Sequence, residues 1–146
     1  IHDTVRLFFG TSGLSVSCRH PDIPDDERNL AHKAASAFYE EIAKPAGVSI
    51  DIDKRIPVGA GLGGGSSDAA AVLRALNRYH GEPLSQKALM NLGKAIGADV
   101  PFLIAGKAAV ATGIGERLAD APKLPALPLL LIFLRACAEQ GGACSK

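Results

Sequence analysis

The sequence is poor in the residues that mark several common protein classes. It has no tryptophan, one methionine and three cysteines in 146 residues. Cys18, Cys137 and Cys144 form an odd set without the spacing of metal ligands, so neither a disulfide framework nor a zinc site is predicted. A reducing compartment, the cytoplasm, is the expected location.

Strong net charge and long apolar runs are also absent. The formal net charge is +1, so no basic surface for nucleic acid is expected. No stretch approaches the ~20 apolar residues that a membrane-spanning helix needs, and no signal peptide is expected at the first residues. Hydrophobic residues make up 47% and charged residues 21% of the chain. These shares, and the chain length, predict one globular domain with a hydrophobic core.

Glycine, in contrast, is concentrated in one stretch. Five of the 16 glycines lie in residues 56–68, which read Ile-Pro-Val-Gly-Ala-Gly-Leu-Gly-Gly-Gly-Ser-Ser-Asp, and an alanine-rich helical pattern follows. Glycine permits positive φ and lets a ligand approach the main chain. The first turn of a helix offers unpaired N–H groups and a partial positive charge. Residues 57–67, here called the glycine loop, therefore predict a phosphate-binding site.

Three alternatives compete with this interpretation. The first is a structural turn in which Ser67 or Asp68 caps the following helix. The second is a P-loop, which requires a lysine after the last glycine, and none is present. The third is a dinucleotide site, because residues 59–64 fit G-x-G-x-x-G. A proline separates the strand from these glycines and a second helical pattern follows the first, which disfavours this site.

Hydrophobic periodicity predicts strands and helices on both sides of the glycine loop. The first two strands are joined by a short glycine-containing turn, so they are expected to pair as a β-hairpin. The charged residues 51–55 are expected to form a solvated strand end, and the four histidines form no cluster that would bind a metal. The expected elements are strands over residues 3–9, 14–19 and 48–52, helices over 26–44, 69–81, 86–96 and just after 99, a strand over 107–112 and a linker over 121–128.

Several motifs, in the same order along the chain, resemble one enzyme superfamily. Residues 57–67 are similar to the ATP-binding motif of the GHMP kinases, and three further segments match: residues 29–30, 51–56 and 97–102. The similarity extends from about residue 3 to about residue 134. It is most marked to the branch of the family whose substrate is a cytidine diphosphate-linked methylerythritol, an isoprenoid precursor.

The resemblance implies an α+β fold, the GHMP kinase N-terminal domain, which is described as ribosomal protein S5 domain 2-like. Family members have an additional N-terminal strand with a Lys-x-Asn element and a C-terminal domain. The chain is therefore expected to be incomplete at the N-terminus and to lack the C-terminal domain. The ATP-binding domain is expected over residues 1–128, and a truncated C-terminal region, whose tail is expected to be disordered, over 129–146.

The resemblance also implies ATP and Mg²⁺ as cofactors and a small-molecule alcohol as the acceptor, with neither nucleic acid nor a membrane as a partner. Phosphoryl transfer needs held phosphates, neutralised charge and a group that takes or orients the hydroxyl proton. Asp99 stands where the family's catalytic aspartate stands. Without the resemblance, an aspartate before Val-Pro is more often a helix N-cap.

The expected ATP-binding residues include most of the glycine loop. Asn29 is added because its match in the family contacts the adenine end of ATP; the alternative is a solvated residue in the first turn of a helix. Ser66 and Ser67 are also candidate Mg²⁺ ligands, because their hydroxyls can bind a phosphate oxygen or a metal ion. The full set is Pro57, Val58, Gly59, Ala60, Gly61, Leu62, Gly63, Gly64, Gly65, Ser66, Ser67 and Asn29.

Two other functions remain open. The first keeps the chemistry and changes the alcohol, as in a homoserine or mevalonate kinase. The second is a nucleotide-binding fragment without catalysis. The predicted fold and glycine loop are compatible with both.

Overall fold

The computed structural model describes residues 1–113, 117–122, 125 and 128–132. Helices and strands are mixed along the chain, as the predicted α+β fold requires. The C-terminal segment expected to be disordered lies largely outside the described residues. The elements are β1 (Thr4–Phe9), β2 (Gly13–Cys18), α1 (Leu30–Glu41), β3 (Gly47–Asp53), α2 (Gly64–Tyr79), α3 (Gln86–Ile96), α4 (Val100–Ala105), β4 (Ala109–Thr112) and β5 (Arg117–Asp120).

The main sheet has three strands in the order β1-β3-β2. β3 is antiparallel to β1 and parallel to β2, so the predicted hairpin is wrong: β3 lies between the two strands. β3 provides the most continuous apolar face, with Val48, Ile50 and Ile52 buried in alternation. The connection from β1 to β2 crosses the start of β3 closely, since a Cβ on Gly47 would lie 3.1 Å from the Thr11 carbonyl oxygen.

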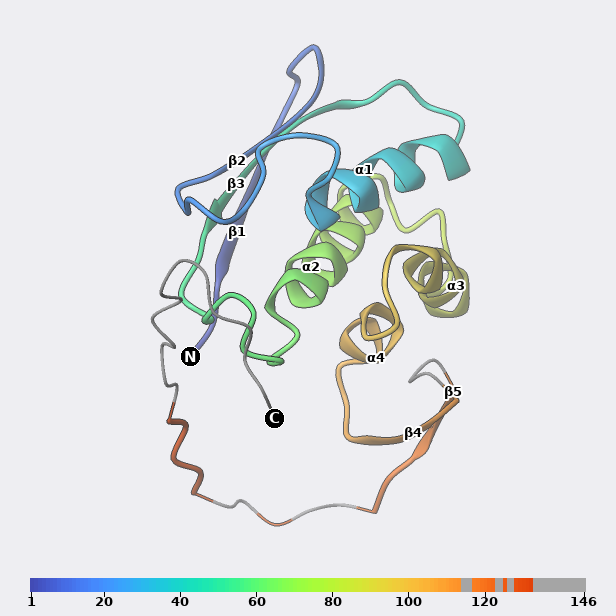
Figure 1. The fold of residues 1–146 in the computed structure, drawn as a ribbon. Coiled ribbons are helices and arrows are strands. Elements are labelled where there is room, and N and C mark those ends of the chain that lie inside the picture. Colours follow the sequence, from blue (N-terminus) through green and yellow to red (C-terminus); the bar gives the residue numbers. More distant parts are fainter. Residues whose placement is uncertain (114–116, 123–124, 126–127, 133–146) are drawn as a thin grey trace.

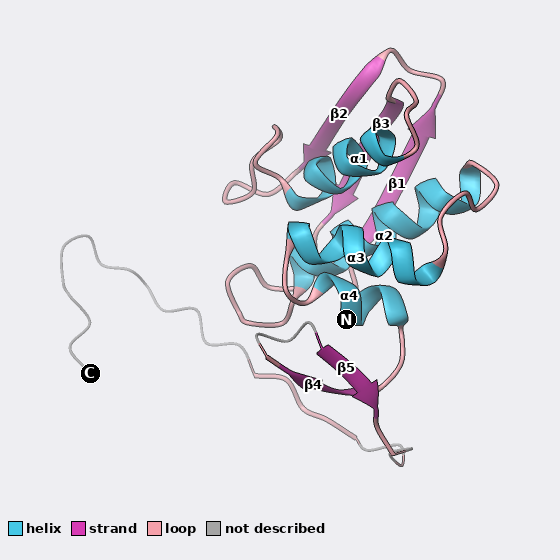
Figure 2. Cartoon of the chain, turned by 90° about the vertical axis from the view of Figure 1, so that its right-hand side faces the viewer, coloured by secondary structure: helices cyan, strands magenta, loops and turns pink. Residues whose placement is uncertain are grey.

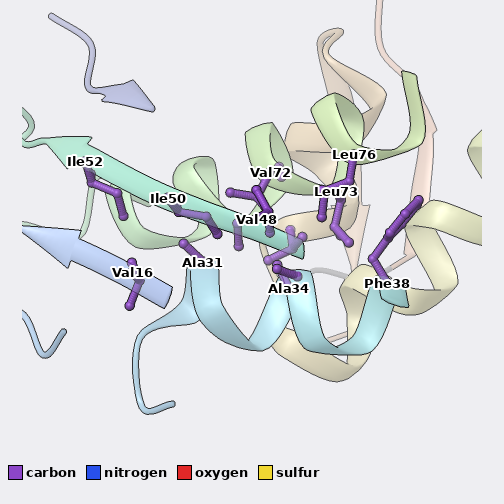
Figure 3. Close-up of a cluster of buried hydrophobic side chains, with 14 of the residues drawn as sticks. Val16, Ala31, Ala34, Phe38, Val48, Ile50, Ile52, Val72, Leu73 and Leu76 are labelled. Atoms are coloured by element: carbon purple, nitrogen blue, oxygen red, sulfur yellow. The ribbon is translucent and has the colours of Figure 1, made fainter. Parts of the chain in front are cut away.

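The hydrophobic core lies between this sheet and two helices. Figure 3 shows the apolar residues of β3 pointing toward α1 and α2. Full burial of one such side chain is worth roughly 1.5–3 kcal/mol. The largest fully buried side chains are Phe38, Val48, Ile50, Ile52, Val72, Leu73, Leu76 and Val100.

The helices form two layers on one side of the sheet (Figures 1 and 2). α1 and α2 lie next to the sheet, and α3 and α4 lie farther from it. The contact between α3 and α4 requires a glycine, because a Cβ on Gly93 would be 2.8 Å from a Val100 methyl carbon. β4 and β5 pair as a separate antiparallel sheet. Among the described residues, no helix has the length and hydropathy of a membrane span.

The helix starts agree with the sequence in one case and differ in two. The Ser85 hydroxyl accepts a hydrogen bond from the Ala88 N–H at 3.2 Å, so Ser85 is the N-cap of α3 and the predicted start of this helix at residue 86 is confirmed. α1 begins at Leu30, later than expected, because Asn29 caps it. α2 begins at Gly64, earlier than expected, so the end of the glycine loop is helical. Helix periodicity could not reveal this start, since the glycines carry no apolar side chains.

Candidate active site

The glycine loop connects β3 to α2 through alternate left-handed residues. Gly59, Gly61 and Gly63 have φ values of 74°, 70° and 67°. Residues other than glycine rarely adopt these values, and alternation of this kind turns successive N–H groups toward a common side, where an anion can bind. The spacing of these three glycines is therefore explained by the backbone conformation of the loop.

The loop ends in the first turn of α2. Gly63 occupies the N-cap position with no side-chain hydrogen bond, so the alternative with Ser67 or Asp68 as the cap is wrong. The Ser67 N–H donates to the Gly63 carbonyl oxygen at 2.8 Å. The N–H groups of Gly64, Gly65 and Ser66 come before this bond and have no acceptor within the helix. They form the positive end of a 16-residue helix.

A cavity of about 330 Å³ lies beside the loop. The glycine loop supplies one wall, from Pro57 to Ser66, and residues of the 23–30 segment supply the other. Lys54 and Asp68 also line the cavity. Eleven of the twelve predicted ATP-binding residues, Asn29 included, thus lie around one space, and Ser67 is the exception.

Asn29 holds the far wall of the cavity in place. Its side-chain oxygen accepts a hydrogen bond from the Ala31 N–H at 2.9 Å, and its side-chain nitrogen donates to the Pro24 carbonyl oxygen at 2.9 Å. The residue is 6% exposed, so the alternative of a solvated first-turn residue is wrong. The adenine contact remains a prediction, and the observed bonds give Asn29 a role in shaping the wall.

Asp99 lies next to the end of the glycine loop. Its Oδ2 atom is 3.9 Å from the position that a Cβ on Gly63 would occupy. Asp99 stands at the N-cap position of α4, but its side chain makes no capping hydrogen bond, so the capping alternative does not describe it. The residue is exposed, and its carboxylate has no partner among the described residues. This carboxylate can accept a proton from a group bound at the loop.

Each member of the triple glycine has a different close neighbour. Gly63 lies beside Asp99, and a Cβ on Gly65 would lie 3.3 Å from a Leu30 methyl carbon. A Cβ on Gly64 would lie 3.0 Å from the Lys54 Nζ atom and 3.1 Å from the Ile56 Cγ2 atom. The loop is therefore closely packed on the protein side.

Lys54 belongs to a buried cluster of charges, so its prediction as part of a solvated strand end is wrong. Its Nζ atom donates to Asp3 Oδ2 at 2.5 Å and to Asp68 Oδ2 at 2.9 Å. The side chains of Lys54, Asp3 and Asp68 are 4%, 3% and 6% exposed. The neighbouring pair of Arg55 and Asp53 is solvated as expected, at 61% and 43% exposed.

Burial and hydrogen bonding act against each other in this cluster. Burial raises the pKa of Asp68 to about 6, because it outweighs the hydrogen bond from Lys54. Burial also acts upward on Asp3, but the hydrogen bonds from Lys54 and from the N–H groups of Arg55 and Ile56 hold its pKa below the ordinary value. Burial opposes the charge of Lys54, and the bonds to both aspartates raise its pKa.

No sequence pattern indicated the cluster. Asp3 and Lys54 are far apart in the chain, and only the β1–β3 pairing, which runs from Thr4 opposite Asp53, brings them together. Asp68 was considered only as a cap. A lysine directly after an apolar strand and three residues before a glycine loop is a pattern to search for in other chains.

The oxygen donors near the loop partly fit a magnesium ion. The described residues hold no group of three His, Cys, Asp or Glu that could bind a metal. Mg²⁺ usually binds one or two protein oxygens together with substrate phosphates and water. The hydroxyls of Ser66 and Ser67 lie in the first turn of α2 and could serve in this way, with phosphates supplying further ligands.

Comparison with known proteins gives consistent matches. A model of the GHMP kinases N-terminal domain matches residues 29–107, which contain Asn29, the glycine loop and Asp99. The 4-diphosphocytidyl-2-C-methyl-D-erythritol kinase of Clostridium botulinum (strain Alaska E43 / Type E3) is 47% identical over 118 residues, which are 81% of this chain and 42% of that protein. The protein of the same name from Acetivibrio thermocellus is 41% identical over 132 residues, 90% of this chain and 47% of that protein.

Solved structures agree with these matches. A crystal structure of 4-(cytidine 5'-diphospho)-2C-methyl-D-erythritol kinase has a TM-score of 0.70 and 44% identity, covering 82% of this chain and 41% of that chain. A homoserine kinase from Cytophaga hutchinsonii, at 24% identity and a TM-score of 0.58, shares the fold. The chain spans less than half the length of the curated relatives it matches.

Proposed function

Because the chain belongs to the GHMP kinase family, we propose that it carries the ATP-binding part of an ATP-dependent kinase. The proposed reaction is phosphorylation of the 2-hydroxyl of 4-diphosphocytidyl-2-C-methyl-D-erythritol, in the non-mevalonate route to isoprenoids. The observation that carries this proposal is the position of the exposed Asp99 carboxylate beside Gly63, where the free N–H groups of α2 begin. The names of relatives at 41% and 47% identity support the choice of substrate.

The glycine loop would bind the triphosphate of ATP. The N–H groups of Gly64, Gly65 and Ser66 have no acceptor within α2 and lie at its positive end, which favours a bound anion. The base and ribose would then occupy the cavity between the loop and the 23–30 segment. Ser66 and Ser67 would help to hold Mg²⁺, which neutralises phosphate charge when it is bound.

Asp99 would accept or orient the proton of the acceptor alcohol. The alcohol oxygen forms a bond to the γ-phosphorus, the bond from that phosphorus to the β-γ bridging oxygen breaks, and ADP leaves with the electron pair. The proton of the alcohol passes to the Asp99 carboxylate. A carboxylate that has neither a capping bond nor an ion-pair partner among the described residues is available for this step.

A binding and turnover experiment tests the proposal. ATP titrated into the chain with MgCl₂ should give a saturable calorimetric signal. Phosphorus NMR should then detect phosphorylation of 4-diphosphocytidyl-2-C-methyl-D-erythritol in preference to homoserine or mevalonate. Preference for either of the other alcohols would contradict the proposed substrate. ATP binding without turnover of any of the three would favour a non-catalytic nucleotide-binding domain, and absence of ATP binding would contradict the proposal as a whole.

A further inference from the structure

The proposed chemistry does not account for the buried cluster of Asp3, Lys54 and Asp68. Among the described residues, these three side chains are nearly inaccessible to water and lie at the protein side of the glycine loop. Burying three charges is costly unless each is paired and hydrogen-bonded. The position of these buried charges beside the glycine loop suggests that they have a role in the loop's conformation.

The cluster joins the two ends of the glycine loop. Lys54 lies at the exit of β3, three residues before the loop, and Asp68 lies directly after the loop, in the second turn of α2. Their hydrogen bond, at 2.9 Å, closes the intervening segment into a ring. The loop therefore cannot move at one end without disturbing the other.

Asp3 holds the start of this closed segment, directly after β3, against the sheet. Its Oδ1 atom accepts hydrogen bonds from the backbone N–H groups of Arg55 at 2.6 Å and of Ile56 at 2.8 Å. Its other carboxylate oxygen accepts from Lys54. One side chain at the start of β1 thus holds both the lysine and the main chain that leads into the loop.

The lysine ammonium also packs against the first residue of α2. A Cβ on Gly64 would lie 3.0 Å from the Lys54 Nζ atom, so the Gly64 backbone lies directly over the charge. The N–H group of Gly64 is one of the free donors at the start of the helix. If Lys54 were displaced, the Gly64 backbone would lose this contact, and its N–H group could move away from the phosphate site.

We propose that Asp3, Lys54 and Asp68 form a clamp that positions the glycine loop for phosphate, with Lys54 as the positioning residue. This inference rests on the proposed function, because it assigns the clamp to the same phosphate site. A segment with five glycines has unusual conformational freedom, and ordering it during binding costs free energy. A clamp that orders the loop beforehand removes part of this cost and so raises the affinity for phosphates.

Substitutions at Asp68 separate positioning from folding. Asp68→Ala removes the bond to Lys54 and leaves the Lys54–Asp3 pair in place, and Asp68→Asn retains an oxygen that can accept from Lys54. We expect Asp68→Ala to weaken calorimetric binding of ATP and of inorganic tripolyphosphate by about tenfold or more, and Asp68→Asn to stay within about threefold of the unmodified chain. Lys54→Met should weaken the binding of ATP and tripolyphosphate as Asp68→Ala does. If Lys54→Met does not fold, the comparison of Asp68→Ala with Asp68→Asn tests the clamp.

Adenosine binding distinguishes a role in positioning the phosphate site from a general structural role. It has no phosphate, so its binding, followed by NMR, should weaken by a clearly smaller factor than that of tripolyphosphate in every folded variant, although Lys54 and Asp68 line the cavity. Asp53→Asn is the matched control, because it removes a nearby, partly exposed carboxylate that pairs with the exposed Arg55, and its ATP affinity should equal that of the unmodified chain.

The outcomes distinguish this inference from the proposed function. Failure of the unmodified chain to bind ATP would overturn both. Equal ATP affinity in folded Asp68→Ala and in the unmodified chain would overturn the clamp alone. An equal loss of affinity for adenosine and for tripolyphosphate would also overturn it, because the defect would then not be confined to the phosphate site.

Discussion

The two flanks of the glycine loop hold their carboxylates in opposite ways. On one flank, the Asp68 side chain is 6% exposed and accepts a hydrogen bond from Lys54 at 2.9 Å. On the other flank, Asp99 is exposed and has no partner among the described residues. Both residues lie close to the glycine loop, Asp68 in the second turn of α2 and Asp99 at the N-cap position of α4.

This difference separates two roles that sequence alone would not separate. A carboxylate that is buried against an ammonium group stabilises one arrangement of the chain and is shielded from a reacting molecule. A carboxylate that is exposed and unpaired can exchange protons with a bound ligand. Under the proposed function, burial and pairing therefore favour a positioning role for the Asp68 side of the loop (the paired flank) and a chemical role for the Asp99 side (the open flank).

The largest expected effect comes from breaking the paired flank. Lys54→Met keeps the approximate length of the side chain and removes its charge, which leaves Asp3 and Asp68 buried without their cation. We expect the free energy of unfolding to fall by about 4 kcal/mol, measured by urea denaturation at pH 7. Arg55→Met is the matched control, because its side chain is 61% exposed, and it should cost less than about 0.5 kcal/mol. Similar losses in the free energy of unfolding for the two variants would contradict the difference between the buried Lys54 and the exposed Arg55.

Removing the charge of Asp99, on the open flank, should lower turnover and leave stability nearly unchanged. Asp99→Asn keeps the size of the side chain and removes most of its basicity. We expect kcat for the proposed phosphoryl transfer to fall by about 10²-fold or more, which corresponds to about 2.7 kcal/mol, with ATP affinity nearly unchanged. The test is a steady-state assay of ADP release with Asp53→Asn as the control. Near-normal kcat in Asp99→Asn would remove Asp99 from the mechanism.

A pH series should sharpen the comparison within the paired flank. The pKa of Asp3 is held below 3.8 in the folded chain, so its ionised form stabilises the fold above the unfolded pKa. This contribution is lost as the pH falls through the lower folded pKa. Asp3→Asn should therefore cost about 2 kcal/mol at pH 7 and progressively less below about pH 4. Urea denaturation at several pH values measures this, and a constant penalty down to pH 3 would contradict the assigned charge state.

Local patterns predicted the parts of the fold that depend on neighbouring residues. The Ser85 cap, the alternating burial of β3 and the apolar face of α2 follow from side chains a few positions apart. The glycine loop could be predicted as a phosphate site because this chemistry would be carried by its own backbone. Asp99 is predicted as catalytic only through its resemblance to a family motif, and that its carboxylate is exposed and has no partner among the described residues is visible only in the structure.

Features that depend on distant contacts were missed. The insertion of β3 between β1 and β2 depends on which strand has the most apolar face, and adjacent strands with a short turn predict the opposite pairing. The Lys54 cluster needs that strand order, since β1 must lie beside β3 before Asp3 can reach Lys54. One error in topology therefore led to the other, and Lys54 was expected in solvent.

The smallest expected effect is on the free energy of unfolding and concerns the N-cap residues of α3 and α4. Ser85 caps α3 through a hydrogen bond from the Ala88 N–H to its hydroxyl, whereas Asp99 occupies the same position of α4 without a capping bond. Ser85→Ala should therefore lower the free energy of unfolding by about 1 kcal/mol, and Asp99→Ala by less than about 0.5 kcal/mol, from the lost interaction with the helix dipole. Urea denaturation of both variants at pH 7 measures the difference. If Asp99→Ala costs as much as Ser85→Ala, Asp99 stabilises its helix as a cap in solution, and the open flank would have a structural role like that of the paired one.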